Sequence, residues 1–370
     1  MKEWNICKVK DLAIMKNGKK RPNTIGHYPV YGGNGIMDYC NTYNNENTII
    51  IGRVGAYCGN VFYCKGKCWV SDNAIALCAN SNNDITYLYY LLTSLDLHHN
   101  HIGGAQPLMT QDIIGNFDVC VPELETQIQI ANILSSVDKK IELNRQINDN
   151  LEQQAQAIYK SWFMDNFQAH WQETSLADVT CKITDGVHNT VIDCPDGEYF
   201  LLSCKNIKNG TLDISSTERK INRETFNKLR KRTQLGKGDI LLTSVGTIGE
   251  LMLLNEDPYN FEFQRSVAII KPNENFISSF FLYGTLKSQI DKIKNTAHGA
   301  VQQCIFLSDL KEYSIYIPEF ELISQYDQIV KPLFDEKVKR EKEIKRLTAL
   351  RDTLLPKLMS GELKINKIDC

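Results

Sequence analysis

The sequence predicts an α+β fold in which two mixed α/β domains are joined by two long antiparallel helices that form a coiled coil. Similar segments recur in the two halves of the chain, about 190–197 residues apart. A long amphipathic segment follows each copy, and the first carries an apolar stripe with alternating three- and four-residue steps. Because self-similarity at one spacing indicates repeated structural units, we expect a pseudo-two-fold internal repeat.

The composition is that of an ordinary soluble protein, with 42% hydrophobic and 23% charged residues among 370. This length allows two or three domains, each with its own core. No apolar run approaches the ~20 residues that span a bilayer, and the start "MKEWNICKVKDL" lacks the apolar centre of a signal peptide. We therefore expect a cytoplasmic protein, no membrane contact, and reduced thiols at its twelve cysteines.

Four cysteines form the only loose cluster in the sequence, but none of them follows a CxxC spacing. A structural zinc site needs four ligands that converge tetrahedrally, so these residues favour small apolar side chains in strands, and no metal site is predicted. The four are Cys58, Cys64, Cys68 and Cys78.

Four pairs of segments define the internal repeat. Each copy contains short β-branched strands and glycine turns, and then changes to a helical pattern. The pairs are "IIIGRVGAYCG" (49–59) with "ILLTSVGTIG" (240–249), "SDNAIALCAN" (71–80) with "QRSVAIIKPN" (264–273), "GGAQPLMTQDI" (103–113) with "HGAVQQCIFLSDL" (298–310), and "VPELE" (121–125) with "IPEFE" (317–321).

The first long helix is the strongest periodic signal. Its stripe keeps one face against a partner helix, and a helix over 127–163 would be ~55 Å long. Two asparagines lie on the stripe, where they would either fix the register of the pair or mark a solvated kink. The stripe consists of Leu134, Val137, Ile141, Asn144, Asn148, Leu151, Ala155, Ile158 and Trp162.

The second helix is less regular. Pro332 is expected in its first turn, where the missing N–H costs nothing, while Pro356 should kink or end the helix and Gly361 should close it. Its apolar positions include Phe334, Val338, Ile344, Leu347, Leu350, Leu354 and Leu358. The expected divisions are globular domains over 1–122 and 168–317, helical regions over 123–167 and 318–363, and a tail over 364–370.

The glycine-rich segment "HYPVYGGNGI" (27–36) raises the question of nucleotide binding. A P-loop would need a lysine after its second glycine, and a dinucleotide fingerprint would need a further glycine where Asp38 stands. Because glycine and asparagine adopt positive φ at little cost, the segment predicts a tight turn. Such a turn would also let backbone N–H groups approach DNA phosphates.

Catalytic patterns are weak. Asp196, Glu218 and Lys220 fit a loose PD…ExK nuclease pattern, but the surrounding "SSTERKINRE" is polar where a buried strand is required. No Pro-Pro pair occurs, so the base-gripping loop of a methyltransferase is missing. His98, His99 and His101 are expected to be polar loop residues. We therefore predict a chain that is not an enzyme by itself and has no catalytic residue.

Local charge points to nucleic acid more strongly than the net charge of −2 does. Residues 217–237 hold eight basic side chains against two acids, a pattern that suits either DNA phosphates or a solvated face. Arginine reads guanine, and asparagine or glutamine reads adenine. The candidates for DNA binding are Lys19, Lys20, Arg21, Asn34 and Arg53 in the first domain, and His188, Arg219, Lys220, Arg223, Arg230, Lys231, Arg232, Gln302 and Gln303 in the second.

An ordered set of motifs resembles the specificity (S) subunit of type I DNA restriction–modification enzymes over nearly the full length. These are "YPVYGGNGI" and "SDNAIAL", then "VPELETQIQIANILSSVDKKIELN" at the first helix. The second half has "ITDGVHNT", "GDILLTSVGTIG", "RSVAIIKP" and the ending "LRDTLLPKLMSGELKI". The second half lacks a GGNG-like turn, so DNA contacts cannot be copied from one half to the other.

The resemblance implies two target recognition domains, each reading one half of a split, asymmetric site in double-stranded DNA. It also implies a helical spacer that docks two methyltransferase (M) subunits, to which two restriction (R) subunits add. The chain itself would bind no cofactor, whereas its partners would use S-adenosylmethionine, ATP and Mg²⁺. Three alternatives stay open: the same scaffold in a type IIB or IIG enzyme, a free-standing Mg²⁺-dependent nuclease, and a pure coiled-coil scaffold.

Overall fold

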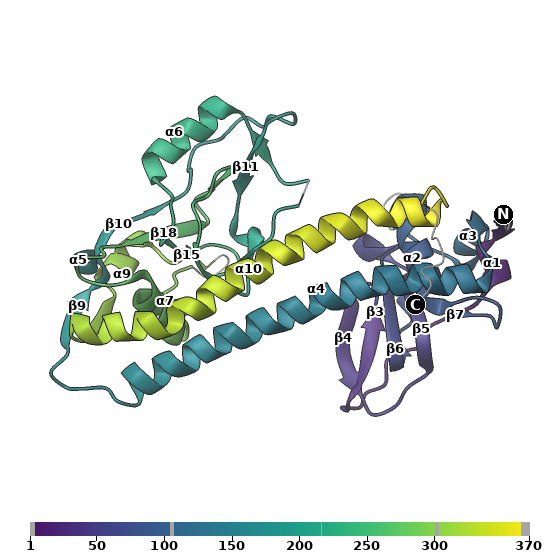
Figure 1. Cartoon of the computed structure of the whole chain (residues 1–370), viewed down its shortest axis with the longest axis horizontal. Helices are drawn as coiled ribbons and strands as arrows, with labels where there is room; N and C mark the ends of the chain where they lie inside the picture. The colour runs from purple at the N-terminus through teal and green to yellow at the C-terminus, as the bar shows by residue number, and fades with distance from the viewer. Residues whose placement is uncertain (1–3, 104–106, 216, 300–302, 364–370) are drawn as a thin grey trace. The chain divides into compact units, whose positions relative to one another are not determined.

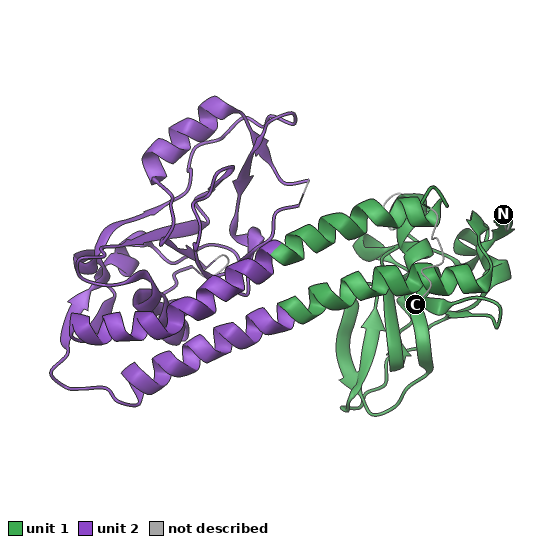
Figure 2. Cartoon of the chain, viewed as in Figure 1, with its two compact units in different colours: residues 1–144, 343–370 green, residues 145–342 purple. Residues whose placement is uncertain are grey.

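The computed structural model describes residues 4–103, 107–215, 217–299 and 303–363. The chain divides into two compact units, one formed by residues 1–144 with 343–370 and the other by residues 145–342 (Figure 2). Both units combine helices with sheets (Figure 1), which confirms the mixed α and β class. Within the described residues no helix is long and apolar enough to cross a membrane. The predicted tail over 364–370 lies outside the described residues.

The first unit is built on a six-stranded sheet in the order β2-β7-β5-β6-β3-β4. The strands are β2 (Ala13–Asn17), β3 (Tyr28–Gly32), β4 (Gly35–Cys40), β5 (Asn45–Gly52), β6 (Val61–Val70) and β7 (Ala74–Ala79), with β1 (Asn5–Lys8) and β8 (Asp118–Val121) in a separate pair. The helices are α1 (Val9–Leu12), α2 (Ile85–Ser94), α3 (Gln111–Gly115), and the 3₁₀ turns η1 (Gly55–Tyr57) and η2 (Leu97–Asn100).

The second unit contains a four-stranded sheet, β10-β18-β15-β16, and a three-stranded sheet, β14-β11-β17. These strands are β10 (Thr180–Asp185), β11 (Tyr199–Leu202), β14 (Lys220–Ile221), β15 (Ile240–Thr243), β16 (Leu251–Leu253), β17 (Phe261–Phe263) and β18 (Val267–Pro272). Two strand pairs accompany them: β9 (Gln172–Ser175) with β19 (Ser314–Ile317), and β12 (Ile207–Lys208) with β13 (Thr211–Leu212). The short helices are α5 (Leu176–Val179), η4 (Cys204–Asn206), α6 (Arg223–Thr233), α7 (Ser279–Ser288), α8 (Ile290–Lys294) and α9 (Leu307–Glu312).

The two units share one strand order. The single strand β6 of the first unit corresponds to two strands of the second unit, β16 and β17. The one sheet of the first unit is therefore divided into two sheets in the second. In both, the parallel contact is the same, β3 with β6 and β11 with β17. The central strands are continuous apolar runs, and β5 and β15 bury every residue of "TIIIG" and "ILLT", as expected for strands covered on both faces.

A glycine stands at the same place in both units, directly after the first strand of the sheet. A Cβ atom on Gly18 would lie 1.9 Å from the Ser71 carbonyl oxygen, and one on Gly186 would lie 2.0 Å from that of Phe263. Only glycine permits so close a backbone crossing. The internal repeat predicted from sequence is therefore present in the local backbone as well as in the strand order.

Two long helices, α4 (Leu124–Tyr159) and α10 (Phe320–Met359), each contribute to both units. In the first unit Asn144 donates to Glu343 at 3.0 Å, and Arg351 pairs with Asp138 at 3.2 Å. In the second unit Lys337 pairs with Glu152 at 3.0 Å, and the ring centroids of Tyr159 and Tyr326 lie 6.1 Å apart. Within each unit, later positions of α4 thus lie opposite earlier positions of α10, so the two segments run antiparallel there.

All nine positions of the predicted stripe on α4 are buried or half-buried. Leu134, Ile141, Asn144, Asn148 and Ala155 are buried, whereas Val137, Leu151, Ile158 and Trp162 are half-buried. Beyond Ala155 the buried positions are Tyr159 and Phe163, each four residues after the last, and a π-helical segment, η3 (Lys160–Met164), ends the helix. On α10, Leu358 is buried, and Ile344, Leu347 and Leu354 are half-buried.

The prediction for Pro332 is wrong. α10 begins at Phe320, so the proline lies in the helix interior, on an exposed position. The helix also continues for three residues past Pro356 and ends before Gly361, whose φ is +72°. An interior proline removes one backbone hydrogen bond, but buried neighbours on the opposite side, Val330 and Phe334, hold the helix against the core of the second unit.

Candidate nucleic-acid interface

In the first unit the structure gathers the predicted contact residues around one loop, Ser71–Asn73. Lys19 donates its backbone N–H to Val70 at 3.0 Å, and Arg53 donates to the Asn73 carbonyl at 2.9 Å. Ser71 donates to Tyr31, at the end of β3, at 2.9 Å. Four chain segments that are distant in sequence therefore meet at one end of the sheet.

The glycine-rich segment is the tip of a hairpin at this same place. β3 and β4 are joined by a two-residue turn, Gly33–Asn34, with Gly32 opposite Gly35. Gly35 has φ +89°, a conformation that side chains rarely adopt. A Cβ on Gly33 would lie 3.7 Å from both Gly52 and the Asn73 carbonyl oxygen. The predicted turn is confirmed.

The side chains differ in how free they are. Lys19, Lys20 and Asn34 are exposed, and Arg53 is half-buried in the turn after β5. Arg21 forms an ion pair with Asp38 of β4. Arg21 therefore braces the loop against the hairpin, while Lys19, Lys20 and Asn34 project from it.

The second unit repeats this loop set. Gly249 donates to Thr243 at 2.9 Å as Gly59 donates to Gly52 at 2.9 Å. The following loop binds the turn in the same way, with Ile305 donating to Ser244 at 2.9 Å and Met109 to Arg53 at 2.8 Å. Because Lys19 bridges to Ser71 and Val187 bridges to Gln264, the loops that carry Lys20 and His188 are equivalent.

The candidates in the repeated loops of the second unit are His188, Gln302 and Gln303. His188 is exposed and its Nε2 lies 2.7 Å from the Asp185 carboxylate. Gln303 is exposed beside Cys304, which bridges to both Val245 and His298. Gln302 lies outside the described residues.

Sequence reasoning missed two residues in the central loop. Arg265 is exposed between Gln264 and Ser266, and its backbone N–H donates to Val187 at 3.1 Å. Asn73 is exposed in the equivalent loop of the first unit. Both belong to segments that were recognised as repeated, "SDNAIALCAN" and "QRSVAIIKPN". Membership of a repeated segment is the only signal that the sequence offers for them, and it does not distinguish them from their neighbours.

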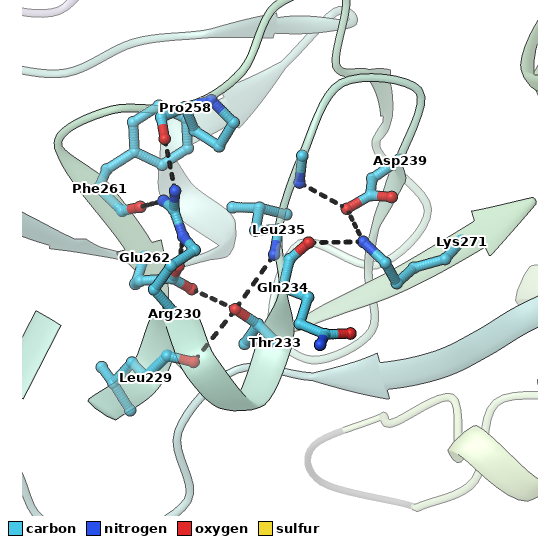
Figure 3. A network of polar contacts seen from close by, with 11 residues as sticks. Leu229, Arg230, Thr233, Gln234, Leu235, Asp239, Pro258, Phe261, Glu262 and Lys271 are labelled. Atoms are coloured by element: carbon cyan, nitrogen blue, oxygen red, sulfur yellow. Dashed lines mark hydrogen bonds and ion pairs between the residues drawn. The ribbon is translucent and has the colours of Figure 1, made fainter. Parts of the chain in front are cut away.

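The basic segment of the second unit divides into engaged and free side chains. Arg219 pairs with Asp193, and Arg232 donates to the Asp185 carbonyl at 2.8 Å. Arg230 pairs with Glu262 and donates to the carbonyls of Pro258 at 2.6 Å and Phe261 at 2.9 Å (Figure 3). The contacts of these three arginines give them structural roles in the second unit.

Three other candidates have no such anchoring. Arg223 and Lys231 are exposed on α6, and Lys220 is half-buried on the edge strand β14. Within the part of the chain that the structure describes, none of these three side chains makes a hydrogen bond or an ion pair. They are therefore available to an anionic ligand.

Two buried carboxylates, Glu262 and Asp239, lie beneath this basic segment, and burial is the largest influence on the pKa of each. The Glu262 side chain is fully buried, and burial raises its pKa although Arg230 opposes the shift and Thr233 donates to it at 3.0 Å. Burial likewise raises the pKa of Asp239, which pairs with Lys271 at 2.5 Å. Figure 3 shows these contacts joined through Gln234 and Leu235, at the end of α6.

The side chains that fit a nuclease pattern, and the histidines of the first unit, are held in structural contacts. Glu218 pairs with Lys205 at 3.0 Å, and Lys220 lies on the edge strand β14. His98 bonds to the Cys58 carbonyl at 2.8 Å and His99 to Asp96 at 2.7 Å. Across the described ranges, no three His, Cys, Asp or Glu side chains are grouped so as to hold a metal ion.

A duplicated α+β unit with polar and basic loops at one end of each sheet defines a class of two-module proteins that present two related surfaces. Residues 1–153 and 169–346 match the family described as "Type I restriction modification DNA specificity domain", and the chain belongs to this family. The resemblance seen in the sequence motifs is thereby confirmed.

Individual relatives agree with this assignment. The chain is 23% identical to the type I restriction enzyme MjaIX specificity subunit of Methanocaldococcus jannaschii, over 99% of this chain and 95% of that protein. It is 24% identical to a putative type I specificity subunit of Mycoplasma pneumoniae, over 88% of each. The crystal structure of a type I restriction–modification S subunit from M. genitalium superposes with a TM-score of 0.59 at 19% identity, covering 98% and 97% of the two chains, and so has the same fold.

Proposed function

We propose that the chain is the DNA specificity subunit of a type I restriction–modification enzyme, and that it reads a split, asymmetric site in double-stranded DNA. The observation that carries the proposal is the repeated loop set, because each unit brings exposed polar and basic side chains to the same end of its sheet. Base reading requires such side chains at the protein surface. Unlike side chains in equivalent loops suit two unlike half-sites.

Direct contacts are assigned to basic and polar side chains of the repeated loops that are at least partly exposed. In the first unit Lys19, Lys20, Asn34 and Arg53 are the proposed contacts, and in the second His188, Arg265 and Gln303. Arginine donates two hydrogen bonds to guanine in the major groove. Asp72 occupies the loop position before Asn73 that corresponds to Arg265 before Ser266, so the two half-sites are expected to differ at the base pair read from this loop.

The helices α4 and α10 are proposed to form a coiled coil that sets the separation of the two half-sites and docks two M subunits, to which two R subunits add. Their antiparallel contacts within each unit support this arrangement. Methylation and cleavage would then belong to the partners, which would bind S-adenosylmethionine, ATP and Mg²⁺. The chain itself is proposed to bind no cofactor and to do no chemistry.

The same scaffold in a type IIB or IIG enzyme is the alternative, and the subunits that copurify with the chain distinguish the two. The proposal is tested by mapping methylated adenines across the genome with and without this protein. A split motif should vanish when the protein is removed. Persistence of every methylated motif, with the methyltransferase present, would refute the assignment.

A further inference from the structure

Helix α6 is an insertion in the second unit. It lies between β14 and β15, whereas residues 41–44 alone join the corresponding strands β4 and β5 of the first unit. The helix is well defined: the Asn222 side chain accepts from the Thr225 N–H at 2.9 Å at its start, and Gln234 in the left-handed conformation closes it. Any ligand contact by α6 is therefore a property of one unit only.

The inner side of α6 is fixed to the second unit. Phe226, Leu229 and Thr233 are buried at helical spacing, and the Phe226 ring stacks on Tyr199 with centroids 4.1 Å apart. Arg230 adds the contacts to Glu262 and to two carbonyls described above. Since apolar packing and an ion pair both hold this side, the outer side is presented in one orientation.

The exposed surface of α6 carries three free cations. Arg223, Lys228 and Lys231 are exposed, and among the described residues none of them makes a hydrogen bond or an ion pair. Glu224 is the one acid in the helix. Lys231 in the last turn complements the helix dipole, but Arg223 in the first turn opposes it, so helix stability does not account for Arg223.

We propose that α6 is a phosphate-binding helix through which the second unit holds the DNA backbone independently of sequence. The inference rests on the proposed function and adds the contact class and its restriction to one unit. Arg223 and Lys231 are eight residues apart, ~12 Å along the helix, so the cations are spread along the helix, as contacts to more than one phosphate require. Lysine is depleted at protein–protein interfaces, which favours DNA over a protein partner.

The test compares the full chain, purified with its methyltransferase partner, with the triple variant Arg223→Ala, Lys228→Ala, Lys231→Ala. Binding of a fluorescent duplex that contains the methylated motif is measured between about 50 and 200 mM salt. Each lost phosphate contact should reduce the slope of log K against log salt by about 0.9, so the slope should become less steep by about 2.7. Affinity should fall on the order of 100-fold for cognate and scrambled duplexes alike.

A matched control removes three lysines from other helices of the same unit, Lys287, Lys292 and Lys311, and should leave the slope unchanged. The methylated motif in cells should be the same for wild type and both variants. An unchanged slope in the α6 variant, a changed half-motif, or loss of the methyltransferase from the complex would overturn the inference. If the wild-type complex binds no duplex at all, the proposed function fails as well, so the two failures are distinguishable.

Discussion

Two neighbouring residues of α6 illustrate how similar cations take opposite roles. Arg230 is directed toward the fully buried Glu262, whereas Lys231 is exposed and free among the described side chains. The difference is set by one step of 100° around the helix, which brings a residue from the buried face to the solvent face. Basic residues in a run are therefore not equivalent candidates for DNA contact.

Arg230→Ala should destabilise the second unit by about 3–5 kcal/mol, because it leaves Glu262 buried without its ion partner. Lys231→Ala should change stability by less than about 0.5 kcal/mol, since it removes an exposed side chain. Urea unfolding followed by circular dichroism measures both. Equal effects of the two substitutions would contradict the structural role assigned to Arg230.

At the scale of elements, the start of α7 is tied to α10 by one carboxylate. Ser278 caps α7 by accepting from Phe281 at 3.0 Å and donates to Asp327 at 2.8 Å. Burial, and then the charge of Glu274, raise the pKa of Asp327 to about 6, against the hydrogen bond from Ser278. The charged carboxylate is therefore a cost to the fold at neutral pH.

The direction in which pH changes the stability follows from the linkage between proton binding and folding. A carboxyl whose folded pKa is raised contributes stability below the unfolded value of about 3.9, and this contribution is lost as pH rises through about 6. Asp327→Asn keeps an acceptor for Ser278 and should stabilise the protein at pH 7.5 by about 1 kcal/mol, reduced from the full shift because the group is only half-buried. At pH 4 the gain should nearly disappear. Thermal unfolding checks both, with exposed Asp291→Asn as control; an equal gain at both pH values would contradict the assignment.

A different polar contact, between α4 and α10, lies inside the core of the second unit. Lys337, 5% exposed, pairs with Glu152, to which Tyr283 donates at 2.8 Å. Although burial opposes it, the attraction of Lys337 and three hydrogen bonds lower the pKa of Glu152. The pair thus contributes stability above the unfolded pKa of Glu152, and this is lost as pH falls through the lowered folded value.

Lys337→Met should cost about 3–5 kcal/mol, because it strands the buried Glu152 carboxylate. Adding Glu152→Gln should restore part of this loss, since the remaining side chain is neutral. A double-mutant cycle in urea measures the coupling, which should exceed about 1 kcal/mol. Additive effects would show that the two side chains do not stabilise each other.

At the scale of the whole molecule, the proposed function assigns half-site identity to the loops and spacing to the helices. One heptad inserted after Asn144 in α4 and before Glu343 in α10 adds ~10.5 Å of helix. If the helices set the spacing, the gap in the methylated motif should lengthen by about three base pairs while both half-motifs persist. Methylome sequencing reads the outcome, and an altered half-motif would contradict the division of roles. The control is a substitution of the same positions without insertion.

The duplication, the mixed α and β class and the first long helix are predictable without a structure, because these follow from local patterns. The "VPELE" segment begins α4 as expected, whereas α10 begins within "IPEFE", well before Pro332. The glycine-rich segment is a turn because Gly35 needs positive φ. Family membership followed from several motifs in a fixed order. Each of these inferences depends only on residues that are close together in the sequence.

Which of the basic and polar side chains are free depends on the three-dimensional fold. Arg230 and Lys231 are adjacent in sequence, yet a glutamate 32 residues from Arg230 engages one and leaves the other. Arg265 could be recognised only once its loop was seen beside Val187, and Pro332 is tolerated because buried neighbours hold its helix. Such outcomes depend on groups brought together by folding, and the energies of these contacts exceed the local preferences on which sequence patterns rest.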